Sequence, residues 1–228
     1  MYVITGATGN TGSGIAEALL ARGEKVRVVG RSAEKLERFV QKGAEALSAD
    51  LGDEAALARA FAGATAVYVM IPPDPTSEHW REQQERQSDA LAAALQKSGA
   101  TYAVTLSSVG ADKAEKVGPV VGLHSLEEKL NRIAGLNVLH LRAGYFMENL
   151  LQYVGLIKTM GMLAGTLRSD LPIAMIANLQ SPSSSSSTRA ICRAAPSVAT
   201  ARSDSSADES SNDVSAVRSR AARWSNLR

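Results

Sequence analysis

Three glycines near the start of the sequence have the spacing of a turn that binds a pyrophosphate. Gly6, Gly9 and Gly12 follow a short apolar run at 2–5 and precede a helical pattern of apolar residues at 15–20. A pyrophosphate binds backbone N–H groups at the positive end of a helix, and a Cβ at the closest points would hold it away. The pattern predicts a dinucleotide site, with a plain strand-to-helix turn as the alternative. The predicted cofactor-binding residues of the turn are Gly6, Thr8, Gly9, Asn10, Thr11 and Gly12.

A cation stands where the second predicted strand ends. Arg31 lies roughly 20 residues beyond the glycine turn, where a site specific for NAD places an acid for the ribose hydroxyls. A guanidinium at this point pairs with a 2′-phosphate, and Lys35 follows one helical turn later. We therefore predict NADP(H) in preference to NAD(H). A solvated arginine at a helix start is the alternative.

Residues after the third and fourth predicted strands are placed to contact the same cofactor. We expect Asp50 to hold the adenine amine and Leu51 the adenine face. The alternative for Asp50 is an N-cap of the next helix, a role for which Asp53 competes. Ile71 and Pro72 are expected over the nicotinamide ribose, although the proline also suits a simple stiffened loop.

Hydroxyl, imidazole and ammonium groups are the candidates for catalysis. Ser107 and Ser108 end the fifth predicted strand, so one of them could hydrogen-bond a substrate carbonyl or the nicotinamide, unless they only cap the strand. On the next helix, His124 could donate or relay a proton, and Lys129 could bind the ribose hydroxyls. The alternative for Lys129 is an exposed lysine among glutamates. The predicted catalytic residues are therefore His124, Lys129 and Ser107.

Alternating strand and helix patterns predict an α/β fold with a doubly wound parallel sheet, the NAD(P)-binding Rossmann type. Strands are predicted at 2–5, 25–29, 46–49, 66–70, 101–106 and 137–141. Helices are predicted at 12–22, 33–42, 54–62, 78–98 and 122–134. With right-handed crossovers, the cofactor lies over the carboxyl ends of the first and fourth strands, where the winding reverses.

The composition changes along the chain and divides it into three predicted regions. Residues 1–142 form the NAD(P)-binding domain, and 143–177 form a partial lobe on the substrate side. Residues 178–228 are mostly serine, alanine, arginine and aspartate, too few apolar residues to offset chain entropy, so we expect a disordered tail. The abrupt change suggests a shift of reading frame near 178–180, which would leave the C-terminal segment truncated or aberrant.

Charge and cysteine content exclude several classes of protein. The 228 residues carry a formal net charge of only +2 and one cysteine, Cys192. These values give no general case for nucleic-acid binding, a disulfide framework or a zinc cluster. We expect no leader before the first strand, and no apolar run is long enough to span a bilayer. We expect a cytoplasmic protein that binds neither nucleic acid nor membrane and has no metal site.

Four stretches together carry a resemblance to a known family. They are Gly6 to Gly12, Leu106 to Asp112, Val121 to Lys129 and, most specifically, Leu141-Arg-Ala-Gly-Tyr-Phe-Met-Glu-Asn-Leu150. Over roughly residues 1–177 the chain resembles the NmrA-like branch of the atypical short-chain dehydrogenases/reductases, especially the NAD(P)H-dependent quinone oxidoreductase-like members.

The resemblance implies one of two functions. One is transfer of a hydride from NADPH to a quinone-like acceptor; the other is an NADP(H)-binding redox sensor that regulates a protein partner and catalyses little. It also implies a substrate side that includes Ser108, Tyr145, Phe146 and Asn149. Ser125 stands where the wider superfamily has the tyrosine of a Tyr-x-x-x-Lys pair, which disfavours alcohol–ketone chemistry. A homodimer and an inactive product both remain open.

Overall fold

A six-stranded parallel sheet forms the centre of the protein, in a computed structural model that describes residues 1–74, 77–161 and 172–178. The strands are β1 (Tyr2–Thr5), β2 (Val26–Gly30), β3 (Glu45–Ser48), β4 (Ala66–Met70), β5 (Tyr102–Ser108) and β6 (Asn137–Ala143). They lie in the order β3-β2-β1-β4-β5-β6, and every neighbouring pair is parallel. The predicted doubly wound sheet is confirmed.

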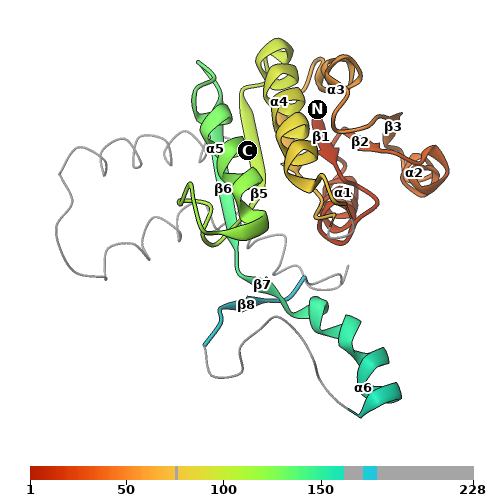
Figure 1. Cartoon of the computed structure of the whole chain (residues 1–228). Coiled ribbons are helices and arrows are strands. Elements are labelled where there is room, and N and C mark those ends of the chain that lie inside the picture. Colours follow the sequence, from red (N-terminus) through yellow and green to blue (C-terminus); the bar gives the residue numbers. More distant parts are fainter. Residues whose placement is uncertain (75–76, 162–171, 179–228) are drawn as a thin grey trace, which may run out of the picture. The chain divides into compact units, whose positions relative to one another are not determined.

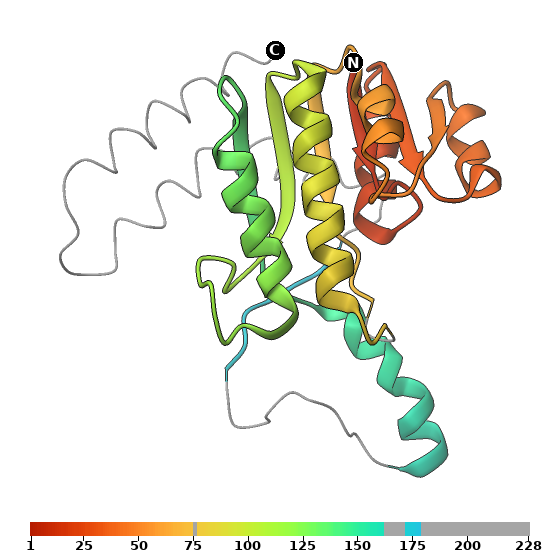
Figure 2. The ribbon, with the colours of Figure 1, turned by 45° about the horizontal axis from the view of Figure 1, so that its top comes forward.

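Helices cover both faces of this sheet (Figure 1). One face carries α1 (Asn10–Ala21) and α2 (Ala33–Val40); the other carries α3 (Glu54–Phe61), α4 (Trp80–Ser98) and α5 (Val121–Asn131). Figure 2 shows α4 and α5 side by side along the strands. The strands read as nearly continuous apolar runs because both faces of a parallel sheet are buried. Phe39 fills the core under α2, and Phe61 fills the core under α3.

The winding reverses between β1 and β4, and doubly wound sheets bind ligands at the carboxyl ends of the strands at such a point. The backbone register of these strands ends with Ile4 opposite Tyr68. One residue further on, the Thr5 hydroxyl donates to the Tyr68 carbonyl (3.0 Å) and accepts from the Met70 N–H (3.3 Å). The side chain of Thr5 thus joins the two strands at the point where the winding reverses.

Strands β5 and β6 run two residues further than the sequence predicted. Their last two register pairs are Ser107 with Arg142 and Ser108 with Ala143. After β6 follow β7 (Tyr145–Phe146), η2 (Met147–Tyr153), α6 (Val154–Met160) and β8 (Met175–Ile176). Strand β7 pairs in parallel with β8, so the chain beyond the sheet folds back on itself in a small two-stranded sheet.

The described residues, up to 178, belong to one compact unit. Residues from 179 onward lie outside the described residues. The predicted disordered tail and the suggested shift of reading frame therefore stay predictions. Across the described ranges, no helix is long and apolar enough to cross a membrane. In the same residues, no group of three or more His, Cys, Asp or Glu side chains assembles that could hold a metal ion.

Candidate functional site

The N-terminus of α1 directly follows the glycine turn and has no capping side chain. Gly9 is the N-cap residue, no side chain caps the helix, and its first turn contains no acid. The Gly9 N–H donates to the Gly6 carbonyl (2.9 Å) and closes the turn. The helix therefore presents its positive end without a built-in anion, which suits a pyrophosphate.

The turn also needs glycine for steric reasons. Gly6 has φ +62°, in the left-handed region that glycine adopts most readily. A Cβ on Gly12 would lie 2.8 Å from the Gly6 carbonyl carbon and 3.1 Å from the Ala7 Cα, both of which are backbone atoms that cannot swing away. The residues present therefore fit a dinucleotide, whose pyrophosphate requires this close packing of turn on helix.

A buried tyrosine supports the first turn of α1. Tyr68, on β4, is 5% exposed, and its hydroxyl donates to Thr11 Oγ1 at 3.2 Å. Burial raises the pKa of Tyr68 to about 12, despite the opposing effect of that hydrogen bond, so the phenol stays protonated and remains a donor. No role was predicted for Tyr68 from the sequence; its signal is one hydroxyl in an otherwise apolar strand.

Two cations follow β2, as a 2′-phosphate site requires. Arg31 and Lys35 are exposed, and neither forms an ion pair with another residue in the described ranges. Ser32 caps α2 by accepting from the Lys35 N–H (3.4 Å), and the Ser48 hydroxyl donates to the Arg31 carbonyl (3.0 Å). The backbone around Arg31 is therefore held while its guanidinium is left to solvent.

The loop after β3 is shaped by two aspartates with different tasks. Asp53 caps α3 by accepting from the Ala56 N–H (3.0 Å), so this cap does not require Asp50. Asp50 instead accepts from the Gly52 N–H (2.8 Å) within its own loop. Leu51 is buried beside it. After β4, Ile71 is buried and Pro72 is half-buried; contact of these residues with a cofactor stays a prediction.

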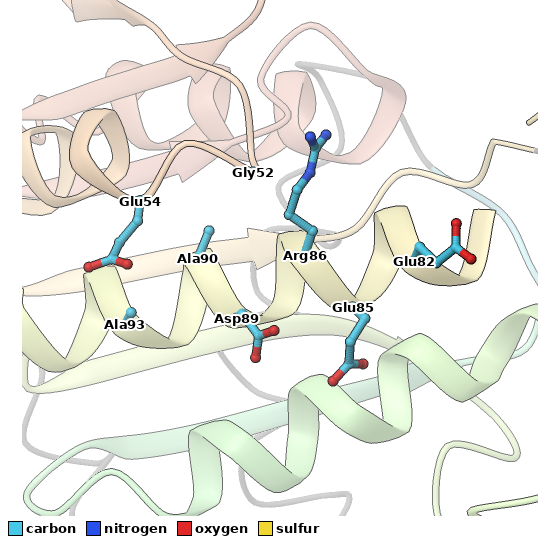
Figure 3. A pocket seen from close by; sticks show the side chains of 8 residues that line it. All are labelled: Gly52, Glu54, Glu82, Glu85, Arg86, Asp89, Ala90 and Ala93. Carbon is cyan, nitrogen blue, oxygen red and sulfur yellow. The ribbon is translucent and has the colours of Figure 1, made fainter. Parts of the chain in front are cut away.

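A pocket of about 710 Å³ lies between α4 and the loop after β3 (Figure 3). Arg86 points from α4 toward Gly52, where a Cβ would lie only 2.8 Å from the Arg86 Nε. The pocket thus adjoins the predicted adenine side. No role was predicted for Arg86 from the sequence. The lining residues are Gly52, Glu54, Glu82, Glu85, Arg86, Asp89, Ala90 and Ala93.

Lys129 lies against α4, which does not support its predicted contact with the nicotinamide ribose. Its Nζ is 2.6 Å from the carboxylates of both Glu85 and Asp89, and it donates to the Ser88 hydroxyl at 2.9 Å. Burial lowers the pKa of Lys129, but hydrogen bonds to Asp89 and Glu85 raise it more, so the ammonium stays charged. Neither the ribose role nor the exposed lysine of the alternative matches this arrangement, because carboxylates on the neighbouring helix hold the cation.

His124 lies beside the loop that follows β5. Its Nδ1 is 2.8 Å from the Ala111 carbonyl oxygen. Because a carbonyl only accepts, Nδ1 carries the proton in this contact, and Nε2 is the acceptor in the neutral ring. His124 could therefore deliver a proton through Nε2 only as the imidazolium cation. This orientation is compatible with the predicted proton donor or relay.

The Ser107 hydroxyl donates its hydrogen bond to another residue of the protein. Its hydroxyl donates to Glu127 Oε1 at 2.5 Å, and the same carboxylate receives Arg142 Nε (3.0 Å) and Nη2 (2.5 Å). A serine hydroxyl has one proton, so in this arrangement Ser107 cannot also donate to a substrate carbonyl. A hydrogen bond from Ser107 to a substrate carbonyl is therefore not supported, whereas one that its oxygen accepts from the nicotinamide amide stays a prediction. Glu127 was missed, although a carboxylate beside the apolar stripe of Leu126 and Leu130 was a signal for a buried partner.

The segment after β6 carries most of the predicted substrate-side residues. The Tyr145 N–H donates to the Ala174 carbonyl (2.9 Å), and Glu148 Oε1 accepts from the Asn178 N–H (2.5 Å). These bonds hold residues 145–148 against 174–178. Phe146 is half-buried, Asn149 is exposed, and Ser108 donates to the Val109 carbonyl at 3.2 Å. Contact of these side chains with a substrate stays a prediction.

Comparison with known proteins agrees with this geometry. The model of the NmrA-like family matches residues 2–210. The chain belongs to the NmrA-like family. Its sequence is 30% identical over 176 residues to (4-alkanoyl-5-oxo-2,5-dihydrofuran-3-yl)methyl phosphate reductase of Streptomyces griseus. That match covers 77% of this chain and 58% of the relative, so the chain spans little more than half the length of that curated member.

Solved structures of similar fold include two reductases with bound cofactor. The NADPH-dependent quinone oxidoreductase from Escherichia coli, complexed with NADPH, has a TM-score of 0.61 and 25% identity, over 71% of this chain and 55% of that chain. The Citrobacter sp. triphenylmethane reductase, complexed with NADP(H), has a TM-score of 0.57 and 20% identity, over 65% and 51%. The predicted NmrA-like resemblance and Rossmann-type fold are confirmed.

Proposed function

We propose that this NmrA-like chain binds NADPH and passes its hydride to a quinone-like conjugated carbonyl. The glycine turn carries the proposal, because Gly12 packs on the Gly6 backbone and leaves the N-terminus of α1 open to a pyrophosphate. The exposed Arg31 supports NADPH over NADH. The Escherichia coli relative, a quinone oxidoreductase complexed with NADPH, supports both parts of the proposal.

The residues of the chain act mainly by binding the cofactor and orienting it against the acceptor. NADPH, when bound, supplies a hydride, and the protein orients the nicotinamide against the acceptor. The N-terminus of α1 takes the pyrophosphate, and Arg31 and Lys35 take the 2′-phosphate. Asp50 and Leu51 take the adenine, while Ile71 and Pro72 take the nicotinamide ribose. The acceptor lies toward Ser108, Tyr145, Phe146 and Asn149.

The acceptor is a quinone because this site offers little acid. Ser125 replaces the usual tyrosine, and a serine hydroxyl is a far weaker acid than a phenol. The Ser107 hydroxyl donates its hydrogen bond to Glu127. A quinone can be reduced without a strong acid at the site, because hydride addition yields an aromatic hydroquinone anion that needs no simultaneous protonation. His124, as the imidazolium, then supplies the proton.

The engagement of two predicted catalytic side chains also favours a second candidate. Ser107 is held by Glu127, and Lys129 is held by Glu85 and Asp89. A chain with these groups committed to its own structure suits an NADP(H)-binding redox sensor, which binds the cofactor, turns over little and acts through a regulatory protein partner.

Calorimetric titration with NADPH and NADH, combined with a quinone-reduction assay on the same sample, tests both candidates. For an enzyme we expect NADPH to bind at least about tenfold tighter than NADH, a difference of about 1.4 kcal/mol, with steady turnover. Binding without turnover would exclude an active enzyme and leave the sensor or an inactive product. Absence of NADPH binding would overturn both.

A further inference from the structure

Glu127 is a buried carboxylate that the proposed hydride transfer does not use. It lies on α5 with 4% of its surface exposed, and it accepts three hydrogen bonds from two strands. Ser107 on β5 provides one of these bonds, and Arg142 on β6 provides the other two. Such a carboxylate is costly to bury alone, so its partners compensate a charge that the fold has placed there.

The three groups meet at the last rungs of the sheet. Ser107 and Arg142 are register partners, and Ser108 pairs with Ala143 in the next rung. Beyond that rung, the Val109 N–H still donates to the Ala143 carbonyl at 2.9 Å. Glu127 therefore bonds to both strands immediately before they separate.

Two segments of the proposed acceptor side leave from this point. The chain after β5 leads to Ala111, whose carbonyl holds the His124 ring (2.8 Å). The chain after β6 leads to Tyr145, which bonds Ala174 (2.9 Å). The glycine turn follows β1 and Arg31 follows β2, and neither of these strands is a neighbour of β5 or β6 in the sheet. The Glu127 carboxylate thus bonds to the strands that lead to the acceptor side, and to no residue of the glycine turn or of the Arg31 region.

We propose that Glu127 is a positioning residue, which fixes the ends of β5 and β6 and so sets His124 and the 143–149 segment around the acceptor. The proposal rests on the proposed function for its catalytic consequence, but its structural part stands apart from turnover. Arg142 is well suited to the task because its planar fork takes a carboxylate at two points and so fixes an angle as well as a distance.

Hydrogen exchange on the full-length chain tests the structural part. In Glu127→Gln we expect the amides of Val109 and Tyr145 to exchange about tenfold faster, while the amides of β1 and β2 change less than about twofold. Glu128→Gln is the matched control, because its carboxylate is exposed and pairs with Arg132 on the outer face of the same helix. Unchanged exchange in Glu127→Gln, or equal acceleration across the whole sheet, would overturn the proposal.

Kinetics on the same variants test the catalytic part. We expect Glu127→Gln to raise the KM for a quinone about tenfold and leave the Kd of NADPH within about twofold, while Glu128→Gln changes neither. Weaker NADPH binding with an unchanged KM would contradict the assignment. If the wild type fails to reduce quinones, the proposed function fails and the exchange result still decides the role of Glu127. If Glu127→Gln does not fold, Ser107→Ala removes one of the three bonds and serves in the exchange experiment.

Discussion

The ammonium of Lys129, on α5, lies 2.6 Å from the carboxylate of Asp89, on α4. The same ammonium also reaches Glu85 and Ser88, so it joins the two helices that cover one end of the sheet. Lys129 is 22% exposed in its side chain, whereas Asp89 is 64% exposed, so water weakens the pair. The contact therefore links helix to helix and occupies the Lys129 ammonium within the protein.

Replacement of Lys129 by methionine should affect stability more than cofactor binding. We expect Lys129→Met to lower the free energy of unfolding by about 1 kcal/mol, because partly exposed ion pairs contribute little individually. The Kd of NADPH should stay within about twofold. Denaturant unfolding and calorimetry measure the two quantities. A large loss of NADPH affinity at unchanged stability would restore the predicted ribose contact.

The glycine turn can be tested with two alanines on one helix. Gly12→Ala places a Cβ against the Gly6 carbonyl, so the turn must open and we expect NADPH affinity to fall at least about a hundredfold, or about 2.7 kcal/mol. Gly14→Ala meets nothing within 4 Å. It should stabilise α1 by up to about 1 kcal/mol and leave NADPH binding intact. Equal binding by both variants in calorimetry would show that the turn does not hold the cofactor.

Arg31 should decide between the two nicotinamide cofactors. Loss of a charge-assisted pair to the 2′-phosphate costs about 1.5–3 kcal/mol, so Arg31→Ala should weaken NADPH binding about 10–100-fold and leave NADH binding unchanged. Arg59→Ala, at an exposed arginine on α3, is the control for the loss of one positive charge. If NADPH and NADH weaken equally in Arg31→Ala, the arginine is not the 2′-phosphate ligand.

The pair of Glu127 and Arg142 should make stability depend on pH. Burial raises the pKa of Glu127, but hydrogen bonds from Arg142 and Ser107 and nearby positive charge lower it more, to below its usual value of 4.5. A depressed pKa stabilises the folded chain above pH 4.5, and this contribution disappears as the pH falls through the folded pKa. We expect Glu127→Gln to cost about 1–3 kcal/mol at pH 7. The difference from wild type in urea unfolding should shrink below pH 4.5, and a constant difference would contradict the assignment.

His124 should matter more for some acceptors than for others. A conjugated ketone needs a proton as the hydride arrives, whereas a quinone yields a stable hydroquinone anion. His124→Asn should therefore reduce kcat/KM about a hundredfold for any ketone that the enzyme accepts and less than about tenfold for a quinone. Paired assays with both acceptors measure the difference. Equal losses would indicate that the imidazole positions the loop at Ala111 and donates no proton.

The sequence by itself determined the sheet and the glycine turn. Both depend on local order: apolar runs of strand length alternate with helical patterns, and Gly6, Gly9 and Gly12 lie within one short turn. The right-handed crossover rule then leaves few strand orders, which explains why β3-β2-β1-β4-β5-β6 was predictable. The position of Arg31 at the end of β2 followed from the same local pattern.

Only the tertiary structure decided what the side chains of α5 touch. A spacing of four places Ser125 and Lys129 on one helical face, but the rotation of the helix on the sheet decides what that face meets. Lys129 forms an ion pair with α4, and Glu127 accepts hydrogen bonds from Ser107 and Arg142. These partners lie 15 to 44 residues away, so no local pattern could connect them. The network forms because packing buries the Glu127 carboxylate, and a buried charge requires the nearest donors.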